Sequence, residues 1–214
     1  MTLKTFKPYT KSTRSTVLID RKNIWKGPPI KSLTKGKVST GGRNNLGRIT
    51  SRNHGGGHKH KYRNIDFYRK KFDLWAEIER IEYDPNRSCH IMLVKFEDGE
   101  KFYYLAPQNM KVGEKIQNGP NSEIKNGNCL PLKDIPVGVN IHNVEINPGG
   151  GGKIARSAGT SVTISGIDGN YSIIKMTSGE VRKIDSRSLA TVGILSLIHI
   201  WRCRRRLRCR SRWS

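Results

Sequence analysis

The sequence predicts an all-β protein, in which a basic extended N-terminal arm precedes two small barrels in series. Three observations lead to this prediction: a charge excess in the flanks, short apolar runs with alternating polar residues, and glycine turns between the runs. Short strands separated by turns every eight to twelve residues or so are typical of small barrels and sandwiches. The predicted units are the arm over residues 1–63, a barrel over 64–120 and a second barrel over 125–193.

The arm is predicted from its charge and from its lack of a sustained apolar period. Residues 1–63 hold 16 Lys and Arg and one acidic residue, a net charge of +15. Residues 64–193 hold 17 basic and 16 acidic residues, so they are almost neutral. A basic arm beside a neutral globular part indicates nucleic-acid binding, and a solvated basic tail is the alternative. Because the arm has little apolar content, we expect it to become ordered only on binding.

The second half of the arm carries the most specific signal. It combines glycines with cations, amides and histidines. Glycine allows close backbone approach to a partner, and arginine presents a fork of donors that fits phosphate oxygens. We expect RNA contacts here from Arg43, Asn44, Asn45, Arg48, Arg52, His54, Gly55, Gly56, Gly57, His58, Lys59, Tyr62 and Arg63.

The first barrel is predicted from three strand-like runs. These runs cover residues 74–83, 89–96 and 101–105. The alternation of the first run slips near Arg80, as it does at a β-bulge. Residues 84–88 have turn composition, and the pair Asp98-Gly99 marks a tight hairpin turn.

The second barrel follows from a similar pattern. Strands are predicted at residues 140–146, 161–166, 171–177 and 181–184. The glycine run 149–152 is expected to be a mobile loop. Arg156 and Ser157 follow that run beside small residues, a composition that allows a close approach to phosphate. An ordinary inter-strand turn with one exposed arginine explains this segment equally well.

Other chemistry finds little support in the sequence. Three closely spaced histidines, His54, His58 and His60, have no cysteine pair nearby, and the surrounding glycines would not fix their geometry as a metal site requires. RNA contact is therefore favoured over metal binding. The glycine runs lack the offset lysine of a phosphate-binding loop, and no serine lies in a nucleophile turn. We therefore expect no enzyme activity, no cofactor, no metal and no small-molecule substrate. No run of apolar residues is long enough to span a membrane.

The last segment, residues 194–214, differs in composition from the rest. It contains seven Arg but no Lys, Gly or acidic residue, and two of the four Trp. We expect a non-native tail translated from foreign sequence. The alternatives are an arginine-rich RNA-binding tail and a metal site at Cys203 and Cys209.

Taken together, the motifs resemble the bacterial-type L-two family of large-subunit ribosomal proteins. The matching segments are residues 41–45, 47–50, 54–59, 62–63, 65–67, 82–87, 98–100, 105–107, 135–138, 142–145, 155–160, 178–182 and 190–193. Within them, the resemblance adds Arg87 and Arg182 to the expected RNA contacts and favours that role for Arg156 and Ser157.

The resemblance implies an OB-fold barrel followed by an SH3-like barrel, both bound to large-subunit rRNA beside neighbouring ribosomal proteins. It further implies roles in subunit assembly, subunit association and the peptidyl-transferase region. The family's Pro-His-Gly-Gly-Gly motif is absent after Gly193, so we expect a truncated member. We expect a bacterial cytoplasmic ribosome, with an organelle ribosome as the alternative. The alternative function is a free-standing single-strand RNA binder or chaperone, with Phe102, Tyr103 and Tyr104 as stacking aromatics.

Overall fold

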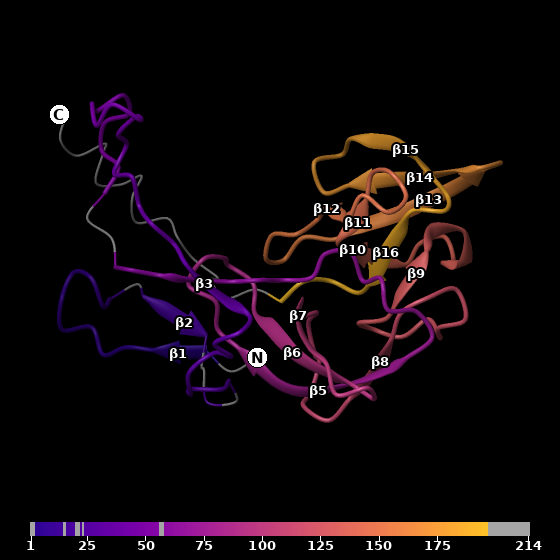
Figure 1. The fold of residues 1–214 in the computed structure, drawn as a ribbon, viewed down its shortest axis with the longest axis horizontal. Helices are drawn as coiled ribbons and strands as arrows, with labels where there is room; N and C mark the ends of the chain where they lie inside the picture. The colour runs from indigo at the N-terminus through magenta and orange to yellow at the C-terminus, as the bar shows by residue number, and fades with distance from the viewer. Residues whose placement is uncertain (1–2, 15, 20–21, 23, 56–57, 197–214) are drawn as a thin grey trace.

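The computed structural model describes residues 3–14, 16–19, 22, 24–55 and 58–196. Within these ranges it contains sixteen short strands, and the only helix there is a 3₁₀ turn at Leu132–Asp134. The arm lies to one side of the molecule, the first barrel occupies its lower centre, and the second barrel lies above it at the far side (Figure 1). The all-β prediction is confirmed.

The arm contains strands that the sequence analysis did not predict. Strand β1 (Leu3–Thr5) pairs with β2 (Val17–Ile19), and β3 (Thr34–Gly36) pairs with β4 (Lys61–Arg63), both antiparallel. Short ladders satisfy backbone N–H and C=O groups even where few apolar side chains are available. The long loop between β3 and β4 contains most of the predicted RNA contacts.

The first barrel contains a four-stranded sheet in the order β7-β6-β5-β8. Its strands are β5 (Trp75–Glu82), β6 (Ile91–Phe96), β7 (Lys101–Leu105) and β8 (Lys115–Gln117). The predicted bulge is confirmed by a register shift between Ile78 and Arg80. The predicted hairpin is also confirmed, since Gly99 adopts a φ of 84° in the turn between β6 and β7. Strand β8 was not predicted.

Strands β6 and β7 are buried on both faces, which explains their nearly continuous apolar sequence. Met92, Val94 and Tyr104 contribute to the cluster inside the barrel. The opposite face forms a second cluster, hereafter the outer cluster. Its buried members are Ile65, Cys89, Ile91, Leu93, Tyr103, Leu105 and Leu195. The arm and the second barrel cover this outer face.

The second barrel is built on a six-stranded sheet in the order β15-β14-β13-β10-β16-β9, and β11 pairs separately with β12. The strands are β9 (Cys129–Pro131), β10 (Asn140–His142), β11 (Val144–Glu145), β12 (Gly152–Ile154), β13 (Val162–Asp168), β14 (Tyr171–Met176), β15 (Val181–Asp185) and β16 (Leu189–Val192). The strand predicted at 140–146 is divided because Asn143 adopts a φ of 50°, which strands do not use.

The start of the predicted tail is part of the fold. Leu195 is 1% exposed in the outer cluster, and its backbone N–H donates to Thr160 O at 3.3 Å. Ser196 Oγ accepts a hydrogen bond from the backbone N–H of His90 at 3.2 Å. Residues 194–196 therefore pack against the body, while the expected tail from residue 194 stays a prediction. The rest of the expected tail, 197–214, lies outside the described residues.

Candidate nucleic-acid interface

The arm loop between β3 and β4 is shaped by a glycine. Gly42 has a φ of 77°, and its carbonyl accepts hydrogen bonds from the N–H groups of Thr50 and Ser51 at 3.0 and 3.1 Å. A Cβ atom at Gly42 would lie 2.1 Å from the Ser51 carbonyl oxygen. Only glycine fits this turn, because other residues disfavour a positive φ and because a Cβ atom would overlap the Ser51 carbonyl oxygen.

The side chain of Asn44 closes the same loop. Its Oδ1 atom accepts hydrogen bonds from the backbone N–H groups of Leu46 and Arg48 at 3.0 and 2.9 Å. This is a typical local capping role for asparagine in a turn. Asn44 was predicted as an RNA contact, but its acceptor serves the loop.

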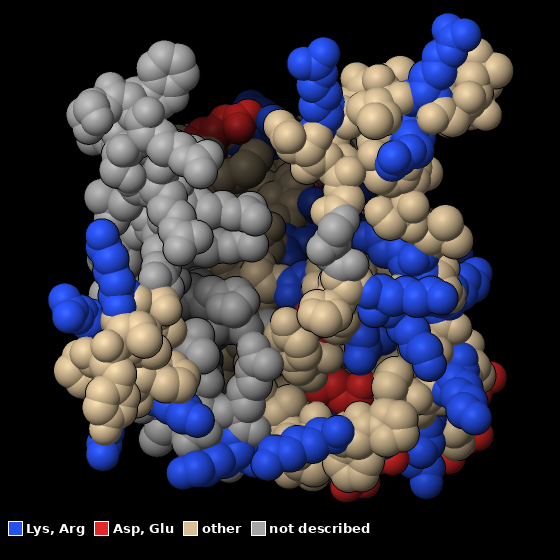
Figure 2. All heavy atoms as spheres, turned by 90° about the vertical axis from the view of Figure 1, so that its left-hand side faces the viewer, with Lys and Arg blue, Asp and Glu red and all other residues tan. Residues whose placement is uncertain are grey.

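The other predicted contacts of the arm loop are exposed, as binding would require. This group comprises Arg43, Asn45, Arg48, Arg52, His54, Gly55, His58 and Lys59. A hollow of about 1070 Å³ lies among them, with Lys37, Arg43 and Lys59 in its lining. The view onto the arm shows many Lys and Arg side chains and few acidic ones on the described surface (Figure 2). Gly56 and Gly57 lie outside the described residues.

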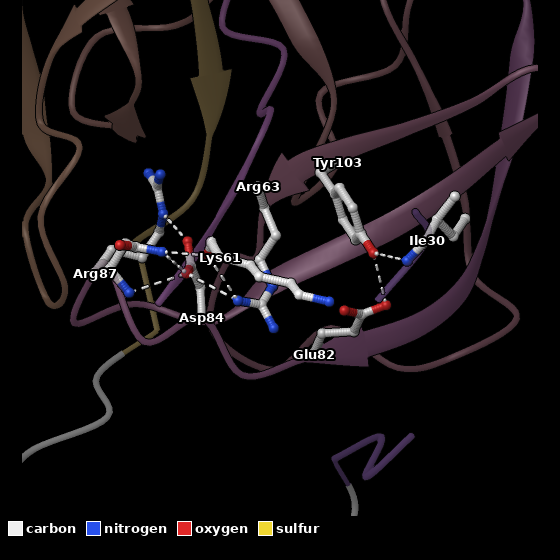
Figure 3. Close-up of polar contacts among 8 residues, drawn as sticks. Ile30, Lys61, Arg63, Glu82, Asp84, Arg87 and Tyr103 are labelled. Atoms are coloured by element: carbon white, nitrogen blue, oxygen red, sulfur yellow. Dashed lines mark hydrogen bonds and ion pairs between the residues drawn. The ribbon is translucent and has the colours of Figure 1, made fainter. Parts of the chain in front are cut away.

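Two predicted contacts, Arg63 and Arg87, are instead tied to a buried carboxylate. Asp84 is fully buried, and its Oδ2 lies 2.6 Å from Nε of Arg87, while its Oδ1 lies 3.5 Å from Nη1 of Arg63. The side chain of Arg87 is only 16% exposed and that of Arg63 only 12%. Figure 3 shows Asp84 between the two arginines, with its contacts to Nε of Arg87 and to the guanidinium of Arg63 drawn as dashed lines. The sequence analysis treated Asp84 as a turn residue and missed this cluster.

A groove of about 570 Å³ lies where the end of the arm, near Tyr62 and Phe67, meets both barrels. Its lining combines cations, hydroxyl groups and apolar side chains, and no acidic residue contributes to it: Tyr62, Phe67, Arg87, Lys153, Ile154, Ala155, Arg156, Ser157, Thr160, Ser161, Val162, Met176 and Thr177. Four predicted contacts, Tyr62, Arg87, Arg156 and Ser157, therefore meet in one place. Phe67 and Lys153 were missed by the sequence analysis.

Arg156 is the best oriented cation of this groove. Its guanidinium carbon lies 4.4 Å from the centre of the Phe67 ring, and Nη1 donates to the Gly152 carbonyl at 3.2 Å. The side chain is nevertheless exposed. Stacking on an aromatic ring restricts the guanidinium while leaving donors free for an anion.

The glycine run that leads to Arg156 is not the mobile loop that was expected. Glu145 is 1% exposed, and its carboxylate accepts hydrogen bonds from Gly149 N, Gly151 N and Leu189 N at 2.9–3.1 Å. A Cβ atom at Gly152 would lie 2.2 Å from Asn143 Oδ1. A buried acid and close packing thus fix the backbone beside Arg156.

Arg182 lies on β15, apart from the residues that line the groove. Its Nε atom lies 2.6 Å from Oε1 of Glu180, and both side chains are half-exposed. This predicted contact therefore has an internal partner, although it is accessible.

Burial favours the neutral forms of one histidine and two cysteines in the barrels. Burial lowers the pKa of His142 to about 3, and its Nδ1 atom lies 2.8 Å from the Gly193 carbonyl oxygen. Burial also raises the pKa of the Cys89 and Cys129 thiols to about 11. In the part of the chain that the structure describes, no three His, Cys, Asp or Glu side chains group as a metal site would need, and no helix could cross a membrane.

Comparison with known proteins identifies the family. The model of the RNA-binding N-terminal domain of ribosomal proteins L2 matches residues 30–118, and the model of their C-terminal domain matches residues 125–204. The large ribosomal subunit protein uL2 of Pelagibacter ubique is 72% identical over 92% of this chain and 70% of that protein. The chain belongs to the uL2 family of large-subunit ribosomal proteins.

Further relatives are bacterial as well. The uL2 proteins of Granulibacter bethesdensis and Rickettsia typhi are 56% and 55% identical over 92% of this chain, which covers 71% and 72% of their lengths. Membership in this structural family confirms the prediction of an RNA-binding ribosomal protein with OB-like and SH3-like domains. Family membership replaces the alternative of a free-standing single-strand binder, and two of its three stacking aromatics, Tyr103 and Tyr104, are buried.

Proposed function

We propose that the chain binds large-subunit rRNA through two surfaces, the exposed arm loop and the groove between the barrels. The observation that carries this proposal is that Arg156 and Lys153 are exposed in a groove whose lining contains no acidic side chain. Arg87 also lines the groove, although it is paired with Asp84 behind it. In the arm loop, Arg43, Arg48 and their neighbours are exposed. These two surfaces together contain most of the residues predicted as contacts.

The two surfaces perform different parts of the binding. In the groove, Arg156 is held by Phe67 and Gly152, so it loses little conformational freedom when it meets a phosphate. Ser157 adds a hydroxyl donor beside it, whereas the Thr160 hydroxyl donates to the Ser157 carbonyl at 2.6 Å. In the arm loop, cations without nearby acids neutralise phosphates and release counterions. Phosphate contacts position the protein, and RNA shape supplies specificity.

We further propose the family roles that the resemblance implies. These are assembly of the large subunit, association of the subunits and support of the peptidyl-transferase region, beside neighbouring ribosomal proteins. Bacterial relatives support a ribosome of the bacterial cytoplasm over an organelle ribosome. Arg182 is proposed as a further contact on the second barrel.

The groove is tested by Arg156→Ala, with Arg187→Ala as the matched control. Arg187 is also an exposed arginine of the second barrel, but it pairs with Asp185 and does not line the groove. We expect Arg156→Ala to weaken binding to a large-subunit rRNA fragment by about 1–3 kcal/mol in filter binding. The control should change binding by less than about 0.5 kcal/mol. Equal losses in the two variants would contradict the proposal.

A further inference from the structure

We infer that Glu82 and Asp84 are positioning residues that hold both ends of the arm loop, so that rRNA meets a loop whose base is already fixed. This inference rests on the proposed function, because it concerns how the arm loop is presented to RNA. Both carboxylates lie at the end of β5 and the turn that follows it, and both are buried, at 2% and 0% exposure.

Glu82 holds the chain just before β3, the strand that leads into the loop. The Tyr103 hydroxyl donates a hydrogen bond to Oε1 of Glu82 at 3.0 Å, and it accepts one from the backbone N–H of Ile30 at 3.1 Å. Figure 3 shows the Tyr103 hydroxyl between these two partners. Arg80 completes the contact, with Nε at 2.7 Å from Oε1 of Glu82. A buried carboxylate thus reaches the arm backbone through one tyrosine.

Asp84 holds the chain where it leaves the loop. Its Oδ1 atom accepts a hydrogen bond from Nδ2 of Asn86 at 3.1 Å, and the same Nδ2 donates to the Lys61 carbonyl at 2.7 Å. Its ion pair with Arg63 adds a second link to β4. Lys61 and Arg63 are the two ends of β4, so Asp84 is linked to both ends of this strand, directly to Arg63 and through Asn86 to Lys61.

Apolar packing joins the two ends to the first barrel. Ile30 and Leu33 pack against the outer cluster. The backbone N–H of Asn64 donates to the Leu33 carbonyl at 2.8 Å, which continues the β3–β4 pairing toward the barrel. Further upstream, Trp25 forms a parallel bridge with Glu82, and the guanidinium carbon of Arg80 lies 4.7 Å from the centre of its ring.

The consequence for binding is entropic. A loop with fixed ends has fewer conformations to lose when its exposed cations meet phosphates, so part of the ordering cost is met before binding. Neither carboxylate can contact RNA itself, because both are buried and carry negative charge. Their removal should therefore weaken binding without removing an ionic contact.

This distinction gives a direct test in the full chain. The variants are Asp84→Asn and Tyr103→Phe, and Glu79→Gln is the control because Glu79 makes an exposed pair with Lys101 on the same barrel. Binding to a large-subunit rRNA fragment is measured over a series of salt concentrations. We expect Tyr103→Phe to lose roughly tenfold in affinity while the slope of log K against log salt stays unchanged. Asp84→Asn also releases Arg63 and Arg87 from their carboxylate, so it should lose affinity without any decrease in the slope. Arg48→Ala should instead reduce the magnitude of the slope by about 1, the amount expected for the loss of one phosphate contact.

Hydrogen exchange completes the test. In the free anchor variants, the Asn64 amide should exchange faster than in the Glu79→Gln control, because its bond to Leu33 closes the base of the loop. Wild-type affinity in both anchor variants, or a reduced slope, would overturn the inference. If Asp84→Asn unfolds, Tyr103→Phe decides, since it removes only the hydroxyl that links Ile30 to Glu82. Failure of the wild-type chain to bind rRNA would overturn the proposed function instead.

Discussion

The arm and the two barrels use their cations in opposite ways. The arm has 16 basic residues and one acid, whereas residues 64–193 have nearly equal numbers of each. In the barrels many cations are neutralised internally: Lys101 contacts Glu79, and Lys183 contacts Asp168. In the arm loop, Arg43 and Arg48 are exposed, and that loop contains no acidic residue. The positive charge of the arm therefore needs an anionic partner from outside the chain, while the cations of the barrels are largely balanced by their own acidic residues.

Two arginines cross this division and show what decides it. Arg63 belongs to the arm by sequence, but its side chain is 12% exposed against Asp84. Arg156 belongs to the second barrel, yet it is exposed in the groove. The availability of a cation for RNA therefore depends on whether a carboxylate is fixed beside it, and not on the segment from which it comes.

The largest effect should come from neutralising the arm loop. We expect substitution of six exposed cations by Gln to weaken rRNA binding at least about a hundredfold and to reduce the salt slope by about 4–5. The six residues are Lys35 on β3 and, in the loop itself, Lys37, Arg43, Arg48, Arg52 and Lys59. Filter binding over a salt series measures both quantities.

The control for this prediction neutralises an equal number of exposed lysines on the barrels. They are Lys95, Lys111, Lys115, Lys125, Lys133 and Lys175. This variant should keep most of the affinity and most of the slope. If both variants lost the same slope, the contrast between the arm and the barrels would be wrong.

A matched pair of glycine substitutions separates the two regions next. In Gly42→Ala and Gly152→Ala the new Cβ would lie 2.1 and 2.2 Å from an oxygen atom, so the local overlap is similar. Gly152→Ala should lower the free energy of unfolding by about 1–3 kcal/mol, because it disturbs a packed barrel. Gly42→Ala should mainly reduce rRNA affinity. Thermal melts and filter binding on both variants check this, and a reversed pattern would contradict it.

The pH dependence of the barrels gives a smaller and more specific effect. His142 is neutral in the fold because burial lowers its pKa to about 3, while an unfolded histidine titrates near 6.5. Between these values the unfolded state binds a proton that the folded state does not. The contribution of neutral His142 to the free energy of unfolding is therefore complete above pH 6.5. Below that pH the free energy of unfolding falls by up to about 1.4 kcal/mol per pH unit.

The variant His142→Asn isolates this contribution. Asparagine keeps a donor for the Gly193 carbonyl but does not titrate. Denaturant unfolding at pH 6.5 and pH 4.5 should show a smaller loss of stability in the variant than in the wild-type chain. The arm histidines are present in both proteins, so their contribution cancels. Equal losses would show that His142 becomes protonated without unfolding.

Alternation predicted the long strands of the barrels and failed for the shortest ones. The run 101–105 was found because it follows the hairpin turn at Asp98-Gly99, and the bulge near Arg80 was found because the alternation of the first run slips there. Strands β3, β4 and β8 have three residues each, too few for a period to be recognised. Their pairing is decided by neighbours that are distant in the sequence.

In the candidate site, too, local composition could be interpreted from the sequence, whereas contacts between distant segments could not. The composition of the arm loop predicted its exposed cations, because a segment without apolar residues cannot bury them. The internal role of Arg63 and Arg87 could not be predicted, because it depends on Asp84 being buried between them. The contribution of Phe67 to the groove depends likewise on its ring lying against Arg156.

The smallest expected effect concerns Arg182 and tests whether a neutralised barrel cation still contributes to binding. Its pair with Glu180 is half-exposed, so Arg182→Ala should change the free energy of unfolding by less than about 0.5 kcal/mol. Glu180 competes with phosphate for the guanidinium, so affinity for the rRNA fragment should fall by no more than about threefold. The companion variant Glu180→Gln removes the competitor and should leave binding unchanged or slightly stronger. Filter binding of both variants at one salt concentration measures this, and a loss as large as that of Arg156→Ala would mean that an internal carboxylate does not make a surface cation unavailable to RNA.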